Sequence, residues 1–386
     1  MTVYLDHAAS TPLRPEAREA WLEAQVAGNP SSVHAEGQRA RRLLEDARER
    51  LARVLGCEPI EVVLTSGGTE SANLALTGLW GARRQGRDAI VLPDGEHHAV
   101  IEPVDHLARE ESADVRAVVL DAEGRILPER LADALAPGDA ALATALVANN
   151  EVGTLQDADA LARVAAEAHT PLHLDAVAAL GHAPVDFARW RGDAPGGSGL
   201  VAMSISGHKI GAPAGTGALV VSRTAALAPL LRGGGQQRAL RAGTQDVAGA
   251  MALATAAELA EAEREEAGVR HAALRERLLA RLARRAPRIR ALGDPVRRVS
   301  ANVHLLLPGA EGESVLFLLD VAGVAASTGS ACQAGVAQAS HVVRAMGFSE
   351  TEARQVLRIT MGRDTTEADV DRAADAIADA CARLTG

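Results

Sequence analysis

The sequence predicts an α/β fold, with a large unit built on a mostly parallel sheet covered by helices and a smaller α+β unit. Three observations favour this fold. Helical segments alternate with short apolar segments before Val247, which is typical of a parallel sheet. A long helical run from Val247 to about Ala286 then leads into a second group of short strands and helices. At 386 residues the chain exceeds one ordinary core, so two domains are expected.

The elements of the large unit can be assigned in chain order. Helices are expected at 15–27 and 37–56, the second ended by Gly56, because glycine readily adopts the left-handed conformation of a C-cap. A third helix is expected at 69–84. Strands or strand ends are expected in seven segments: 61–66, 88–93, 115–120, 141–150, 171–177, 200–206 and 217–222.

The smaller unit is predicted from the segments that follow the long helical run. These segments are 302–307, 313–323, 324–328, 356–362 and a final helix from Glu367. We expect the large unit to cover residues 15–255, and the small unit to comprise residues 1–14 and 256–386. The glycine-rich segment GDAPGGSG (192–199) is expected to be an exposed loop or a flexible insertion.

The composition argues against several classes of function. Aromatic residues make up 2% of the chain and the formal net charge is −10, which disfavours a base-stacking nucleic-acid platform and general polyanion binding. Three cysteines form no disulfide framework, and the opening MTVYLDHAAS does not resemble a signal peptide. No apolar run reaches the length of a membrane span. We therefore expect a cytoplasmic protein that binds neither nucleic acid nor membrane.

Loops after predicted strands carry the candidate functional residues, because ligands of open α/β sheets bind beyond the carboxyl ends of the strands. In TSGGTESANL, Gly68 and Thr69 lie where a helix begins, and its free N–H groups would suit a phosphate. The alternative is an ordinary turn capped by Thr69. In SGHKIGAPAG, Lys209 could form a Schiff base beside Ser206 and His208, or it could simply face solvent.

Three more loops add to this chemistry. In HLDAV, Asp175 ends a strand, where it could pair with a protonated pyridine nitrogen or cap a helix. In GEHHAV, His97 or His98 could stack on a planar cofactor or transfer protons, and adjacent side chains point apart, so at most one is expected in the site. In ASTGSACQAG, Cys332 could be a nucleophile. These parts together predict a pyridoxal phosphate site, and we predict no metal site because no zinc-binding spacing occurs.

Ten segments carry a family resemblance. They are YLDHAASTP, GNPSSVH, TSGGTESANLAL, EHHAV, NNEVGTLQ, SGHKIGAPAGTGAL, GGGQQRALRAGT, STGSAC, SHVVRAMG and RITMGR. These segments span nearly the whole chain. In their residues and in their order, the sequence resembles the cysteine desulfurases, which are fold-type I pyridoxal phosphate enzymes of the class V aminotransferase superfamily. The spacing from the cysteine to SHVVRAMG resembles the group with the longer cysteine loop.

The resemblance implies a role for each candidate residue. Lys209 would hold pyridoxal 5'-phosphate covalently and move the substrate's α-proton, Asp175 would keep the pyridine nitrogen protonated, and His97 would stack on the ring. The other residues that it implies are Gly68, Thr69, Ser206 and His208 for the phosphate, Thr244 for the phosphate of the partner subunit's cofactor in a homodimer, and Asn150, Arg358 and Asn29 for the substrate carboxylate. An arginine suits a carboxylate because its fork binds both oxygens.

The resemblance also implies the reaction. The Cys332 thiolate would attack the sulfur of bound L-cysteine, which would release L-alanine and leave a persulfide on Cys332. A segment of small residues would let the thiol move between the cofactor and a sulfur acceptor. In the longer-looped group the acceptors are iron–sulfur scaffold proteins or tRNA-modifying partners. We interpret Cys57 and Cys381 as structural, because cysteine is often buried.

Two departures from the family pattern stand out. The family usually carries a glutamine three residues after the strand-end aspartate, where it hydrogen-bonds the cofactor's phenolic oxygen, whereas this chain has Ala178. We expect an altered titration of the lysine–cofactor bond, or a substitute such as His182 or a water. The segment 192–199 is the second departure, and we interpret it as a tolerated loop extension.

Ala178 keeps a second activity open, a related pyridoxal phosphate selenocysteine or cysteine lyase or an aminotransferase. A lyase would release pyruvate and ammonia instead of alanine, and an aminotransferase would not need Cys332. A non-enzymatic binding partner is a further alternative, which the intact Lys209, Asp175 and Arg358 disfavour. A nicotinamide enzyme is disfavoured because the glycines of GGSGLV precede a strand instead of following one.

Overall fold

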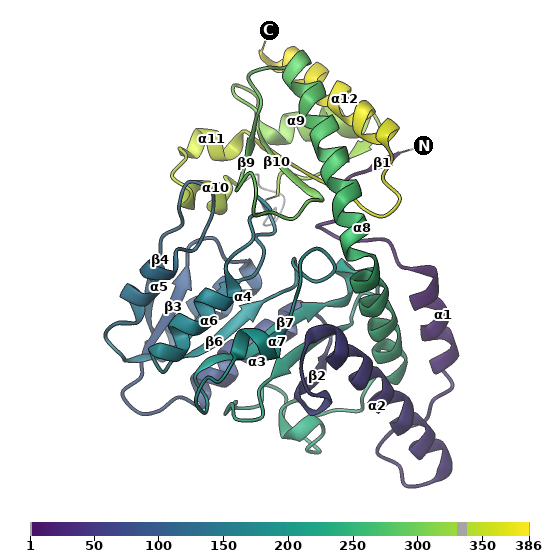
Figure 1. The fold of residues 1–386 in the computed structure, drawn as a ribbon, viewed down its shortest axis with the longest axis vertical. Coiled ribbons are helices and arrows are strands. Elements are labelled where there is room, and N and C mark those ends of the chain that lie inside the picture. Colours follow the sequence, from purple (N-terminus) through teal and green to yellow (C-terminus); the bar gives the residue numbers. More distant parts are fainter. Residues whose placement is uncertain (1, 330–337, 386) are drawn as a thin grey trace.

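A seven-stranded sheet forms the centre of the computed structural model, which describes residues 2–329 and 338–385 (Figure 1). Its strand order is β2-β8-β7-β6-β5-β3-β4. The strands are β2 (Val62–Thr65), β3 (Ala89–Pro93), β4 (Asp114–Val118), β5 (Ala140–Leu146), β6 (Pro171–Asp175), β7 (Gly199–Ser206) and β8 (Gly217–Val221). Strands β7 to β4 run parallel, and β8 is antiparallel to both β2 and β7. The predicted α/β fold with a mostly parallel sheet is therefore confirmed.

Helices cover both faces of this sheet. They are α2 (Ala35–Leu55), α3 (Gly68–Gly81), α4 (His98–Glu111), α5 (Pro128–Leu135), α6 (Ala158–Glu167) and α7 (Phe187–Arg191). Successive strand residues enter opposite cores, as Ile90 packs with α3 and α4 while Val91 packs with the core that holds α2, α5 and α6. All seven residues of β5 are buried, which explains its continuous apolar run.

A second, smaller group of elements follows the 39-residue helix α8 (Val247–Arg285). Its strands are β9 (Arg290–Leu292), β10 (Asn302–Leu306) and β12 (Val356–Thr360), which form an antiparallel sheet. Its helices are α9 (Gly312–Val321), α10 (His341–Ala345), α11 (Glu350–Arg354) and α12 (Glu367–Thr385). Helix α8 passes through residue 255 without a break, and it contacts α1 (Pro15–Ala24) and α2 as well as α12 (Figure 1). The domain boundary near residue 255 therefore stays a prediction.

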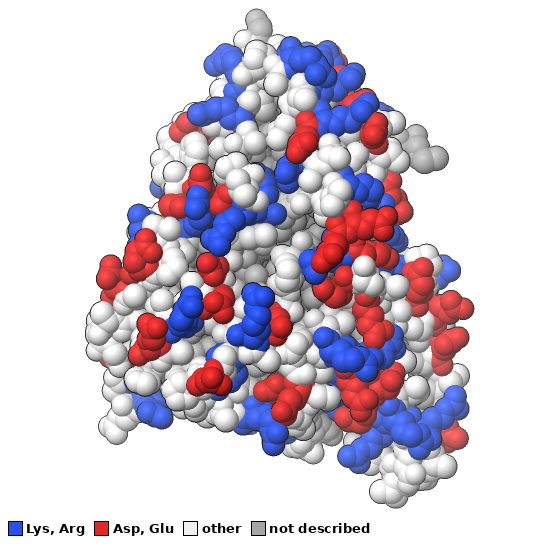
Figure 2. Space-filling model, in the orientation of Figure 1, with Lys and Arg blue, Asp and Glu red and all other residues white. Residues whose placement is uncertain are grey.

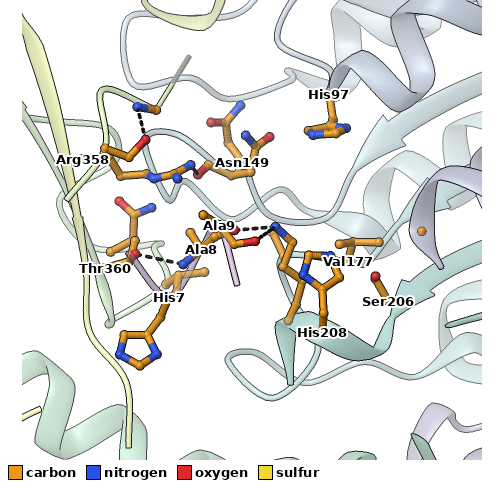
Figure 3. Close-up of a pocket in the computed structure, with 18 of the residues that line it drawn as sticks. His7, Ala8, Ala9, His97, Asn149, Val177, Ser206, His208, Arg358 and Thr360 are labelled. Carbon is orange, nitrogen blue, oxygen red and sulfur yellow. Dashed lines mark hydrogen bonds between the residues drawn. The ribbon is translucent and has the colours of Figure 1, made fainter. Parts of the chain in front are cut away.

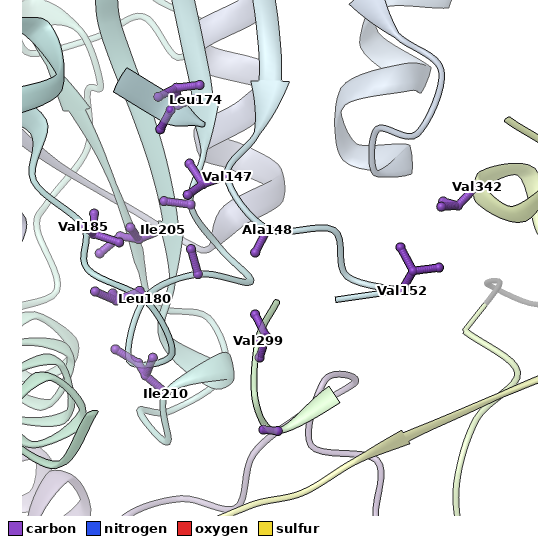
Figure 4. Close-up of a cluster of buried hydrophobic side chains, with 14 of the residues drawn as sticks. Val147, Ala148, Val152, Leu174, Leu180, Val185, Ile205, Ile210, Val299 and Val342 are labelled. Atoms are coloured by element: carbon purple, nitrogen blue, oxygen red, sulfur yellow. The ribbon is translucent and has the colours of Figure 1, made fainter. Parts of the chain in front are cut away.

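The N-terminal segment crosses to the smaller group. Strand β1 (Val3–Tyr4) pairs in parallel with β11 (Val324–Ala325), and Asp6 forms a bridge with Thr360 of β12. The apolar core is also shared, since Leu174 of β6 belongs to the same cluster as Val342 of α10 (Figure 4). The two groups of elements are therefore joined by backbone pairing and by one core.

Two expectations about loops and membranes can be compared with the structure. The segment 192–199 is a largely exposed connection between α7 and β7, as expected, but Arg191 fixes it by donating to the carbonyl oxygens of Ser198, Gly196 and Leu200. Among the helices of residues 2–329 and 338–385, none has the length and apolar character that a membrane span requires.

Candidate active site

A cavity of about 690 Å³ lies beyond the carboxyl ends of the parallel strands, where the smaller group of elements meets the large sheet (Figure 3). Its walls come from distant parts of the chain: the N-terminal segment 7–9, the start of α3, the loops after β5, β6 and β7, and the segments 326–329 and 358–361. Most of the residues that the sequence predicts for the site line this cavity.

Lys209 lies in a short 3₁₀ turn directly after β7. Its Nζ donates to the carbonyl oxygens of Ala8 at 2.5 Å and Ala9 at 3.1 Å. Burial lowers the pKa of Lys209 to about 8, and the Arg358 cation adds to this shift. Lys209 is also the only lysine in the chain. Lys209 lines the cavity and is therefore not the solvent-facing lysine that the sequence left open as an alternative.

Asp175 is the last residue of β6 and is 4% exposed. Its Oδ1 accepts a hydrogen bond from the backbone N–H of Val177 at 3.0 Å, which closes a turn. No helix begins there in the described chain, so the interpretation of Asp175 as a helix cap is wrong. Burial raises the pKa of Asp175 to about 6, while the Val177 N–H and the Lys209 cation oppose this shift.

The start of α3 lines the cavity with its first residues. The helix begins at Gly68 with Gly67 as its N-cap, so the interpretation of Thr69 as the cap is wrong, and Thr69 lies in the first turn. The first N–H groups of a helix have no acceptor within it. A Cβ on Gly68 would lie 2.8 Å from Cγ2 of Val177 and 3.3 Å from Cβ of Ser206, so only glycine fits here.

Ser206 and His208 line the same cavity as Gly68 and Thr69, and Ser206 lies next to Gly68. Ser206 ends β7 and is buried, and His208 follows it in the 3₁₀ turn. Burial, together with the Lys209 cation, lowers the pKa of His208 to about 4. At neutral pH its imidazole is therefore uncharged and can donate only one hydrogen bond.

His97 precedes α4 as its N-cap, and its Nδ1 accepts from the N–H of Ala99 at 3.0 Å. The ring faces the cavity and His97 keeps an exposed part, while desolvation by the surrounding walls lowers its pKa to about 4, with Lys209 adding to the effect. Because Nδ1 is an acceptor, the neutral ring carries its proton on Nε2. His98 does not line the cavity and instead packs its ring 5.1 Å from that of His341.

Arg358 lies in β12 and is 5% exposed. Its Nη1 donates to the carbonyl oxygen of Asn150 at 2.9 Å, and its Nη2 donates to Oδ1 of Asp6 at 3.0 Å. Within the described chain, the buried Nε of Arg358 has no acceptor and the buried Oδ1 of Asn150 has no donor. Both residues line the cavity, so unpaired polar atoms are available there for a ligand.

Three predicted residues stand apart from this arrangement. Asn29 lies in the exposed loop between α1 and α2, where its Oδ1 accepts from the N–H of Ser31, and it does not line the cavity. Thr244 is exposed and lines a smaller hollow of about 190 Å³ that shares Ser66 with the cavity. Cys332 lies outside the described residues.

The structure also brings residues to the cavity that the sequence interpretation missed. His7, Ala8 and Ala9 form one wall of the cavity. The family motif YLDHAASTP, which contains them, is the sequence feature that could have placed them in the site. Ala178 and His182, which the sequence had already singled out, line the cavity as well, and burial lowers the pKa of His182 to about 4. The missing glutamine therefore affects the site itself.

Comparisons with known proteins agree with this geometry. The family described as Aminotransferase class-V matches residues 3–373. The chain is 45% identical to an IscS-like cysteine desulfurase of Mycobacterium tuberculosis, in an alignment that covers 98% of this chain and 96% of that protein. A solved structure described as a NifS-like protein superposes with a TM-score of 0.90 at 30% identity and covers all of both chains. Another, described as SspA in complex with cysteine, has a TM-score of 0.80 at 30% identity and covers 93% of this chain and 99% of that one.

Proposed function

Since this chain belongs to the class V aminotransferase family and is a cysteine desulfurase within it, we propose which of its residues remove the sulfur of L-cysteine and in what roles. The observation that carries the proposal is the position of the only lysine. Lys209 is half-buried and lines a cavity that is also lined by a carboxylate, Asp175, and a guanidinium, Arg358. This set suits an amino-acid substrate and an aldehyde cofactor.

Pyridoxal 5'-phosphate is the cofactor that we propose, because the family consists of enzymes that use it and the donor set fits it. The free N–H groups at the start of α3 support phosphate binding, as does the absence of room for a Cβ on Gly68. Thr69, Ser206 and His208 would add donors to the phosphate. Asp175 would pair with the pyridine nitrogen, and Lys209 would bond the aldehyde carbon.

When bound, this cofactor withdraws electrons from the substrate and so eases loss of the α-proton and cleavage of the carbon–sulfur bond. The residues supply the rest. Arg358 and Asn150 bind the substrate carboxylate, and Nζ of Lys209 holds and moves the α-proton. His97 remains neutral because its pKa is lowered to about 4, so its ring can pack against the cofactor without adding a second cation beside Lys209.

Cys332 is the proposed nucleophile. Its Sγ forms a bond to the sulfur of L-cysteine while that sulfur's bond to Cβ breaks, and the Cβ takes a proton to become the methyl group of L-alanine. The product on the protein is a persulfide, and no external oxidant is needed. The role of Cys332 is supported by the family resemblance and by Gly329, which lines the cavity three residues before it.

We extend the proposal to the partners of the reaction. A sulfur-acceptor protein, either an iron–sulfur scaffold or a tRNA-thiolation enzyme, would take the persulfide sulfur. A homodimer would bring Thr244 to the cofactor phosphate of the partner subunit, which agrees with its exposed position outside the cavity of its own chain. Sedimentation should then give twice the chain mass of 40.0 kDa.

The reaction is tested by incubating the cofactor-loaded protein with L-cysteine and no reductant. We expect one equivalent of alanine per active site and one added sulfur atom on Cys332, detected by mass spectrometry of the intact protein. Added reductant should release sulfide and permit further turnovers. Equal alanine formation by Cys332→Ala without reductant would refute the persulfide mechanism. Pyruvate and ammonia in place of alanine would identify a lyase.

A further inference from the structure

Arg358 is the only arginine among the described residues that line the cavity, and its guanidinium is fixed at two of its three nitrogens. The Nη1 contact is to a neutral carbonyl oxygen of Asn150, and the Nη2 contact is to the carboxylate of Asp6. The Arg358 side chain is 6% exposed, so its charge is largely withdrawn from water. A buried guanidinium needs a compensating anion and a fixed orientation.

Asp6 is held in place independently of its carboxylate. Its backbone forms a bridge with Thr360, and its carbonyl oxygen accepts from the N–H of Ala9 at 3.0 Å. The next residue but one, Ala8, donates its N–H to Oγ1 of Thr360 at 2.9 Å. The carboxylate of Asp6 is therefore a rigidly mounted anion, and replacing it should leave the N-terminal segment in position.

We propose that Asp6 is a positioning residue of the reaction, whose carboxylate holds Arg358 in the orientation in which the guanidinium binds the substrate carboxylate. This inference rests on the proposed function. The Asp6 and Asn150 contacts fix the guanidinium plane and leave the Nε–H without an acceptor among residues 2–329 and 338–385. Without Asp6, the guanidinium partner that Arg358 retains in the described part of the chain is a neutral carbonyl oxygen, and its charge can turn toward other acceptors.

The same carboxylate acts on Lys209. Among the described residues, the charged and titratable groups that act on this amine are Arg358 on β12, Asp6 in the N-terminal segment, Asp175 at the end of β6, His208 in its own turn and His97 before α4. Arg358 lowers the pKa of Lys209, whereas Asp6 and Asp175 raise it. Loss of the Asp6 charge should therefore lower the pKa of Lys209 below its value in the wild-type protein.

The first test is steady-state alanine formation by the cofactor-loaded Asp6→Asn protein. We expect the KM for L-cysteine to rise about five- to tenfold, because a hydrogen bond to a charged partner is replaced by a neutral one, and kcat to change less. Asp6→Glu should recover part of the loss. The control is Asp139→Asn, which removes the carboxylate paired with Arg116 at 2.6 Å in a region that does not line the cavity. An unchanged or lower KM for Asp6→Asn would overturn the inference.

The second test needs neither cofactor nor activity. In the cofactor-free protein, N-acetoxysuccinimide acetylates the only lysine, and peptide mass spectrometry follows its rate against pH. Asp6→Asn should move the half-maximal rate to lower pH, and Asp139→Asn should not move it. An identical midpoint for Asp6→Asn and wild type would overturn the inference. Absence of alanine from the wild-type protein would refute the proposed function, while this second measurement would still test Asp6.

Discussion

At the scale of single residues, the walls of the cavity set the charge of each group. Burial lowers the pKa of Lys209 to about 8 and that of His97 to about 4, and it raises the pKa of Asp175 to about 6. Near pH 7.5 Asp175 is therefore mostly ionised, His97 is neutral, and a substantial fraction of Lys209 is already a free amine. A free amine is the nucleophilic form, so burial prepares Lys209 to react with an aldehyde.

The pH dependence of Lys209 gives a direct prediction. Its folded-state pKa is below that of an ordinary lysine, so the protonated, unreactive form should persist only below about pH 8. Acetylation of Lys209 in the cofactor-free protein should reach half of its maximal rate near pH 8, whereas the same lysine in the denatured chain should need a pH near 10.5. Equal midpoints for the folded and the denatured protein would contradict the burial that the structure shows.

The cysteines allow a second prediction at this scale. Burial raises the pKa of Cys57 to about 12 and that of Cys381 to about 11, so at pH 8 both remain protonated thiols. The thiolate is the form that reacts with iodoacetamide. We expect alkylation of the native protein at pH 8 to modify Cys332 first, and the Cys332→Ala protein to react much more slowly. Rapid labelling of Cys57 or Cys381 in native protein would disprove this.

At the scale of elements, the sequence predicted helices and strands well where the pattern was local. Helix α2 ends at the predicted Gly56, whose φ of 62° is left-handed, and α8 covers the predicted run from Val247. Helix α3 begins one residue before the predicted Thr69, and its N-cap is Gly67, with a φ of 148°. The sequence pattern favours Thr69 because threonine is the more usual N-cap. The backbone of Gly67 packs against Gly217 of β8, a contact between distant segments that a local sequence pattern does not reveal.

A glycine substitution tests the proposed phosphate site at the start of α3. Gly68→Ala should weaken binding of pyridoxal phosphate by about tenfold or more, because the added methyl group meets Val177 and Ser206 where the phosphate is proposed to lie. Fluorescence or absorbance titration of the cofactor-free protein measures this. The matched control is Gly268→Ala in α8, where a Cβ meets nothing within 4 Å. That change should leave cofactor affinity unaltered and stabilise the fold by up to about 1 kcal/mol.

At the scale of the whole molecule, the cavity depends on contacts that no local pattern reveals. Arg358 meets Asp6 across 352 residues, and Lys209 meets Ala8 across 201. The strand-end loops could be predicted because parallel strands place their carboxyl ends together. The N-terminal wall could not, because it follows from the pairing of β1 with β11, both only two residues long. The family resemblance supplied the role of Thr244, which lies outside the cavity of its own chain, and that of Cys332, which lies outside the described residues.

Removal of residues 2–9 tests the importance of these contacts between the N-terminal segment and the rest of the cavity. The truncated protein loses β1, the Asp6 carboxylate and the carbonyl oxygens that hold Lys209. We expect it to lose alanine formation and to unfold at a lower temperature, since the N-terminal segment joins the smaller group of elements to the cavity. Calorimetry measures the second effect. Wild-type activity in the truncated protein would show that this segment has no role in the site.

The single lysine has a consequence for the surface as well. Of the 40 lysine and arginine residues, 39 are arginine, and Figure 2 shows basic and acidic groups interspersed over one face of the molecule. Arginine stays protonated far into the alkaline range, and lysine acetylation cannot neutralise it. The surface of this protein therefore keeps its positive charges under conditions, such as acyl donors or high pH, that neutralise the lysines of an ordinary surface. Lys209 is the only side-chain amine that can be acylated. Chemical modification of lysine in this chain would therefore always modify the residue proposed for catalysis.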